Sequence, residues 1–170
     1  PAIQDYQEAI RLNPKDAGIH YSKGVAHDEI GQYERAIQDF NEAIKLNPTN
    51  AEAYYGRGLA YSKIEQHECA IQDFNETIKL NPQTIRLNSQ AAAYYNRGTA
   101  YCNIGQWETA IQDFDTTIKL DPKYMHAYYN RGVAYYNRGQ YKQAITDFNK
   151  TIKLDPNTNA YYSRGVAYEA

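Results

Sequence analysis

The strongest constraint on this chain is a sequence period of 34 residues. Prolines at positions 14, 48, 82, 122 and 156 follow one another at intervals of 34, 34, 40 and 34, and Asn or Asp precedes each of them. The string Ala-Ile-Gln-Asp-Phe begins at Ala36, Ala70 and Ala110, and it returns with one change at Ala144. A fixed period of this length indicates a stack of similar units, none of which can bury its apolar face alone.

Each unit contains two amphipathic segments. Over residues 51–63, Tyr54, Gly58 and Tyr61 recur at the spacing of one helical face. Residues 36–46 carry the wide apolar stripe of a second helix. Glycines suited to a left-handed turn stand between the two segments at Gly31, Gly105 and Gly139. The proline ends the second segment, because the residue before a proline is disfavoured in the helical region. Each unit is therefore predicted to be helix–turn–helix.

A second set of glycines falls inside the first predicted helix of each unit. These are Gly24, Gly58, Gly98, Gly132 and Gly165. Glycine within a helix costs about 0.5–1 kcal/mol relative to alanine, so a close approach by a neighbouring helix is expected there. We predict that the contacting residues are the alanines of the second helix at positions 36, 70, 110 and 144.

These residues resemble the tetratricopeptide repeat (TPR) family over essentially the whole chain. In one unit the matching positions are Gly58, Tyr61, Ala70, Phe74 and Pro82. The resemblance implies an all-α fold, a right-handed superhelical α-solenoid of antiparallel helix-turn-helix units. Residues 1–170 then form a single array, interpreted as a piece of a longer one. Full repeats are expected at 17–50, 51–84, 91–124 and 125–158, with a second-helix half repeat at 1–16, a first-helix half repeat at 159–170 and an insertion at 85–90.

The resemblance also implies a concave groove, lined by the first helices, that receives an extended peptide or a partner helix. The implied groove residues are Tyr21, Tyr55, Tyr95, Tyr129, Tyr162, Asn96, Asn130, Leu59, Thr99, Val133 and Tyr136. Tyrosine offers rigid contact area with a polar tip and is enriched at interfaces. The alternative is that repetition has copied a tyrosine whose role is packing.

One specialised groove of the family binds the acidic C-terminal tails of chaperones. It requires lysine, arginine and asparagine at set positions of three successive first helices. Here Tyr21, Val25, Tyr55 and Leu59 occupy such positions, and the basic residues are missing. Chaperone-tail binding is therefore not expected.

Basic residues recur on the first helices and aspartates on the second helices. The basic set is Lys23, Arg57, Arg97, Arg131 and Arg164, and the acidic set is Asp5, Asp39, Asp73, Asp113 and Asp147. A planar guanidinium suits a two-point contact with a carboxylate. We predict a ladder of ion pairs between each second helix and the first helix that follows it. The alternative is an arginine row that binds acidic ligands.

Several functional classes find no support in the residues. Eighteen basic and twenty acidic residues give a net charge of −2, which lacks the basic excess of a nucleic-acid surface. No apolar run is long enough to span a membrane. Two cysteines, Cys69 and Cys102, favour a reducing, cytoplasmic setting. No histidine has the spacing of a catalytic or zinc site, so no enzyme activity, cofactor or metal is expected.

The sequence thus predicts a protein–protein interaction scaffold that binds a peptide or helix. Two alternatives remain: an architectural spacer or self-assembling solenoid segment, and a regulatory TPR domain of a larger protein. The two terminal half repeats suggest head-to-tail self-association. The insertion at 85–90 is interpreted either as a neutral lengthening of the loop or helix, or as an additional apolar contact through Ile85 and Leu87.

Overall fold

A computed structural model describes residues 2–80, 87–156 and 158–170, and every regular element in these ranges is an α-helix. The helices are α1 (Ala2–Leu12), α2 (Ala17–Glu29), α3 (Tyr33–Leu46), α4 (Ala51–Lys63), α5 (His67–Leu80), α6 (Leu87–Asn103), α7 (Trp107–Leu120), α8 (Met125–Asn137), α9 (Tyr141–Leu154) and α10 (Thr158–Glu169). The all-α prediction is confirmed.

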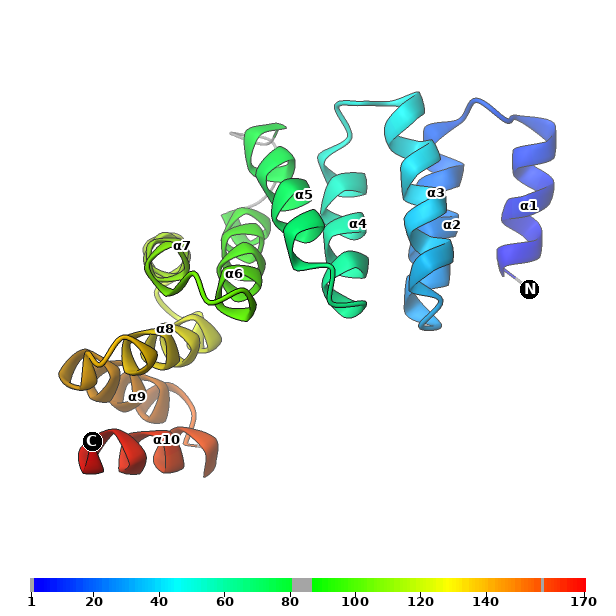
Figure 1. The fold of residues 1–170 in the computed structure, drawn as a ribbon. Coiled ribbons are helices and arrows are strands. Elements are labelled where there is room, and N and C mark those ends of the chain that lie inside the picture. Colours follow the sequence, from blue (N-terminus) through cyan, green and yellow to red (C-terminus); the bar gives the residue numbers. More distant parts are fainter. Residues whose placement is uncertain (1, 81–86, 157) are drawn as a thin grey trace. The chain divides into compact units, whose positions relative to one another are not determined.

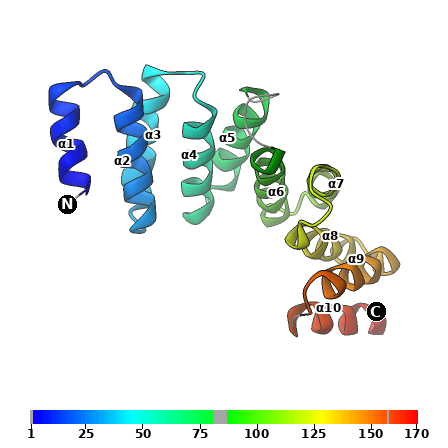
Figure 2. The ribbon, with the colours of Figure 1, turned by 180° about the vertical axis from the view of Figure 1, so that it is seen from behind.

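The chain divides into two compact units, residues 1–82 and 83–170. In the first unit α2 packs against α3 and α4 against α5, and α3 packs against α4 to join the two pairs. In the second unit α6 pairs with α7 and α8 with α9, and α10 packs on α9 (Figure 1). Seen from behind, the paired helices again lie side by side (Figure 2). Stacked helical hairpins, as in an α-solenoid, are therefore present within each unit.

Local sequence explains where the helices begin and turn. The side chain of Asp16 accepts hydrogen bonds from the backbone N–H groups of Gly18 and Ile19 at the start of α2, and Asn50 does the same for Ala53 in α4. The predicted turn glycines have positive φ angles: Gly31 74°, Gly105 75° and Gly139 71°. Glu65 takes the same conformation, with φ 60°, in the hairpin that lacks the glycine. The turn prediction is confirmed.

Each hairpin is centred on a phenylalanine. Phe40, Phe74, Phe114 and Phe148 are at most 1% exposed. A Cβ atom added to Gly24, Gly58, Gly98 or Gly132 would lie 2.8–2.9 Å from a carbon of the ring on the second helix of the same hairpin. The prediction that the glycines face the alanines was wrong. The phenylalanine stands one helical turn beyond the alanine on the same face, and its larger ring fills the space beside the glycine.

The insertion affects the helix that follows it. Residues 85 and 86 lie outside the described residues, and α6 begins at Leu87 rather than at position 91. It is 17 residues long, whereas α2, α4 and α8 have 13 each. Residues 87–90 thus add about one turn to a first helix.

Two glycines at equivalent repeat positions should respond in opposite ways to substitution by alanine. Gly132→Ala places a methyl group against Phe148 and should lower the free energy of unfolding by about 1–3 kcal/mol. A methyl group added to Gly165 in α10 would meet no atom within 4 Å, so Gly165→Ala should raise it by about 0.5–1 kcal/mol. Urea unfolding followed by circular dichroism measures both; effects of the same sign would contradict the packing described.

Candidate functional site

The tyrosines predicted to line the groove are held in place by the core. Tyr21, Tyr55, Tyr95 and Tyr129 are all half-buried. Each ring lies 5.8–6.0 Å, centroid to centroid, from the phenylalanine of its own hairpin. Tyr162 on α10 differs, since 73% of its surface is exposed. The first four tyrosines therefore have a packing role, whether or not they also contact a partner.

Hydrogen bonds join successive first helices of the second unit. Asn130 donates from Nδ2 to the hydroxyl of Tyr95 (3.0 Å) and to that of Thr99 (3.4 Å). One repeat further on, the Tyr129 hydroxyl lies 3.2 Å from the Ser163 hydroxyl. Burial raises the pKa of Tyr95 above its ordinary value, and this hydroxyl is neutral near pH 7. Some of the polar side chains that were predicted to bond to a ligand therefore form hydrogen bonds between repeats instead.

A pocket of about 220 Å³ opens between α6 and α8. Its lining residues are Thr99, Cys102, Asn103, Trp107, Asn130 and Val133. Three predicted groove residues, Thr99, Asn130 and Val133, are thus brought together in one hollow. Burial raises the pKa of the Cys102 thiol to about 12, so the pocket wall is uncharged at this position near neutral pH.

A second pocket, of about 170 Å³, opens between α8 and α10. Its lining residues are Val133, Tyr136, Phe148, Tyr162, Ser163 and Val166. The predicted groove residues Val133, Tyr136 and Tyr162 meet here. Four lining positions of the two pockets correspond by repeat: Thr99 to Val133, Cys102 to Tyr136, Asn130 to Ser163 and Val133 to Val166. The second unit therefore presents two pockets at equivalent repeat positions, with Val133 shared between the two.

The sequence placed the groove on the first helices alone, so lining residues on the second helices were not predicted; Asn103, on the first helix α6, was not predicted either. Trp107 and Phe148 belong to the second helices α7 and α9. Trp107 occupies the repeat position of Tyr33 and Tyr141, at the start of a second helix. An aromatic residue recurring at that position was the available signal.

Two further predicted groove residues, Tyr55 and Leu59, lie on α4 of the first unit, and Asn96 lies on α6. Tyr55, Leu59 and Asn96 are half-buried. In α2, Asp28 occupies the repeat position that Cys102 has in α6 and Tyr136 in α8. Its buried Oδ1 lacks a hydrogen-bond partner among the described residues. Burial raises the pKa of Asp28, although the charge of Lys63 opposes this. The chemistry of this face therefore differs between the two units.

Four of the five basic residues of the first helices are paired with aspartates, whereas Arg164 on α10 donates to Asn149. The pairs are Lys23–Asp39, Arg57–Asp73, Arg97–Asp113 and Arg131–Asp147. Each of the three arginines donates two hydrogen bonds to its carboxylate, over 2.6–2.8 Å. The guanidinium groups also lie over tyrosines three residues earlier: Arg57 over Tyr54, Arg97 over Tyr94 and Arg131 over Tyr128, at 5.2–5.6 Å. This arrangement does not favour an arginine row that is free to bind acidic ligands.

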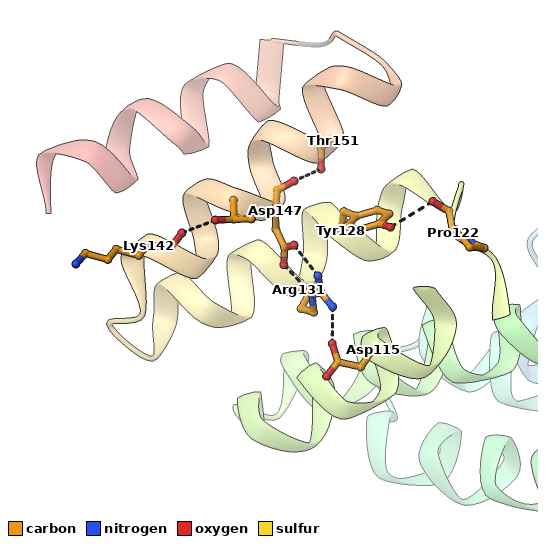
Figure 3. A network of polar contacts seen from close by, with 8 residues as sticks. Asp115, Pro122, Tyr128, Arg131, Lys142, Asp147 and Thr151 are labelled. Atoms are coloured by element: carbon orange, nitrogen blue, oxygen red, sulfur yellow. Dashed lines mark hydrogen bonds and ion pairs between the residues drawn. The ribbon is translucent and has the colours of Figure 1, made fainter. Parts of the chain in front are cut away.

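The predicted connectivity of the ladder was wrong, because each pair lies within one hairpin. Arg131 and Asp147 stand at equal sequence distances from the turn residue Gly139, so they face each other across the antiparallel helices. Arg131 also reaches back to Asp115 on α7, over 2.5 Å (Figure 3). Burial opposes the charge of Arg131, but the bonds and charges of Asp147 and Asp115 outweigh it and raise its pKa.

The two carboxylates on Arg131 should contribute unequally to stability. The Asp147 side chain is 5% exposed and that of Asp115 is 51% exposed. We expect Asp147→Asn to lower the free energy of unfolding by about 2 kcal/mol, since a buried charge-assisted bond is weakened. Asp115→Asn should change it by less than about 1 kcal/mol, and Asn is the residue at the equivalent positions 41 and 149. Urea unfolding of both variants provides the measurement, and equal losses would contradict the expected ranking.

Metal-binding clusters and membrane-spanning helices are both absent from the described residues. Within these ranges, no group of three or more His, Cys, Asp or Glu side chains is placed to hold a metal ion. Among the helices of the same residues, none is both long enough and apolar enough to cross a membrane.

Comparison with known families identifies the class of protein. The profile described as TPR repeat matches residues 2–31, 29–65 and 98–139, and the profile described as tetratricopeptide repeat matches residues 51–84 and 126–158. These matches include more than half of the chain. The chain belongs to the tetratricopeptide repeat family.

Individual relatives resemble the chain to different extents. The crystal structure of MamA is 29% identical, with a TM-score of 0.83 over 90% of this chain and 86% of MamA. YrrB is 24% identical, with a TM-score of 0.82 over 96% of this chain and 82% of YrrB, a likeness that concerns the fold alone. The Hsp70-Hsp90 organising protein of Plasmodium falciparum (isolate 3D7) is 43% identical over 35 residues, which are 21% of this chain and 6% of that protein.

Proposed function

We propose that this chain is a protein-interaction scaffold that binds a peptide or helix of a partner protein in the groove lined by its first helices. The observation that carries the proposal is the pair of repeat-equivalent pockets in the second unit. Five of the predicted groove residues line them, and a concave, mostly apolar hollow with a few polar groups is the usual form of a binding site.

The family and its members support a role of this kind. Solenoid repeats present extended surfaces on which partners bind. YrrB is described as a TPR protein with an unusual peptide-binding site, and the relative from Plasmodium is named Hsp70-Hsp90 organising protein. For this chain we propose peptide binding without the chaperone-tail specificity, because the pocket walls carry no basic side chain.

A spacer or self-assembling segment is the second candidate function. The observation that favours it is the internal use of the groove tyrosines, whose rings pack on phenylalanines and whose hydroxyls bond to neighbouring repeats. Exposed apolar residues on α1 and α10, such as Leu12 (72%) and Tyr168 (65%), would serve head-to-tail contact between copies. A regulatory domain of a larger protein would use either surface.

Two exposed tyrosines of α10 provide a matched test of groove binding. Peptides selected from a display library on the full chain are titrated calorimetrically against the wild type, Tyr162→Ser and Tyr168→Ser. Tyr162 lines a pocket and Tyr168 does not, while both are largely exposed. We expect Tyr162→Ser to weaken binding about tenfold, as for an interface anchor worth about 1.4 kcal/mol. Tyr168→Ser should leave the affinity unchanged.

Failure to select any peptide, or equal loss in both variants, would count against groove binding. Sedimentation velocity over a range of concentrations then examines the second candidate. A mass that grows with concentration in the wild type but not in Tyr168→Ser would support self-assembly through α10.

A further inference from the structure

The side chains that line the two pockets of the second unit limit the kind of ligand group that they can accept. None of their lining residues, from Thr99 and Cys102 to Ser163 and Val166, has a charged side chain. Because burial raises the pKa of Cys102, its thiol also stays neutral near pH 7. A charged ligand group buried here would lose its hydration without meeting an opposite charge, which is costly. The pocket walls therefore favour uncharged side chains.

The size of each pocket limits the ligand group that fits. An apolar cavity of about 150 Å³ holds a benzene molecule. The pockets measure about 170 and 220 Å³, so each has room for one large aliphatic or aromatic side chain. Phe148 and Val166 provide apolar contact in one pocket, and Trp107 and Val133 in the other.

The distance between successive first helices sets the spacing of the two ligand side chains that would occupy the two pockets. The pockets follow α6, α8 and α10, which are successive first helices that contact one another in sequence. Neighbouring packed helices lie about 8–10 Å apart. In the extended polyproline II conformation, residues three apart return to the same face after about 9 Å. Two side chains at this spacing would enter adjacent pockets.

The polar groups at the pocket walls favour an extended ligand over a helical one. Asn130 uses its Nδ2 within the groove, which leaves its Oδ1 as an acceptor for a ligand N–H group. Ser163 occupies the equivalent position in the next pocket. A helical partner bonds its backbone N–H groups internally, whereas an extended backbone presents them to such acceptors.

We propose that the second unit binds an extended, uncharged segment of a partner protein through two large apolar side chains three residues apart, one in each pocket. The proposal rests on the proposed function and names the chemistry of its ligand. The first unit offers a contrast, because Asp28 places a carboxylate at the position of Cys102 and Tyr136.

The test uses the full chain and synthetic peptides with blocked ends and no charged residues. Two leucines are placed two, three or four positions apart in an otherwise polar sequence, and a fourth peptide has one leucine. A fifth peptide, made helical by a hydrocarbon link, has leucines seven apart. Fluorescence anisotropy measures each affinity, and we expect the three-apart peptide to bind at least about tenfold more tightly than the single-leucine peptide.

Protein variants assign the effect to the pockets. Thr99→Lys and Ser163→Lys each place a charge in one pocket and should lower the affinity of the three-apart peptide to that of the single-leucine peptide. Ser62→Lys in α4, a half-buried position of the first unit, is the control and should have no effect. Circular dichroism verifies folding. Peptides with glutamate or lysine in place of leucine test whether the unaltered pockets accept a charged side chain. Both kinds of peptide should bind poorly.

The outcomes separate this inference from the proposed function. Affinities independent of leucine spacing, tighter binding of a charged peptide, or tighter binding of the helical peptide would each overturn the inference. Groove binding would still stand if library-selected peptides were weakened by Tyr162→Ser. If neither peptide set binds the chain, both proposals fail.

Discussion

The close contact between a glycine and a phenylalanine organises each complete hairpin. The phenylalanine ring fits beside the glycine because no side chain occupies that place, and the ring becomes almost fully buried. The groove tyrosine of the same hairpin then packs against this ring. In the last hairpin Phe148 also lines a pocket. The position of this tyrosine is therefore set by a packing contact in the core, and a change at the glycine would displace the tyrosine as well.

A second set of interactions connects the hairpins to one another. Arg131 of α8 binds Asp147 of α9 within its hairpin and Asp115 of α7 in the preceding one (Figure 3). Arg57 forms the same arrangement with Asp73 and Asn41 in the first unit. In helical geometry Arg131 points about 200° away from Tyr129, two residues earlier. Ion pairs and groove thus occupy different faces of one helix, which lets the groove residues vary while the stack is maintained.

Much of the fold followed from the period, because turn glycines and prolines act locally. Gly31, Gly105 and Gly139 take the left-handed conformation expected of a glycine between two helices. Thr99, Val133 and Tyr136, which were predicted to face the groove, lie on pocket walls, since residues on one helical face stay together. That they bind a partner stays a prediction. The contacts between helices were harder to predict. That Phe148 rather than Ala144 meets Gly132 depends on ring size and direction across a hairpin, which a repeat pattern does not specify. Likewise, the bond of Asn130 to Tyr95 depends on the neighbouring repeat.

The position of Val133 has a consequence for how such a protein changes over time. Because this residue forms a wall of two adjacent pockets, a substitution there alters both at once. Residues such as Thr99 and Ser163, in contrast, belong to one pocket each. Under the proposed function, the ligand preference of one pocket is therefore not independent of that of its neighbour. Neighbouring pockets share a residue, so selection for a new ligand in one of the proposed sites would constrain what the adjacent site accepts.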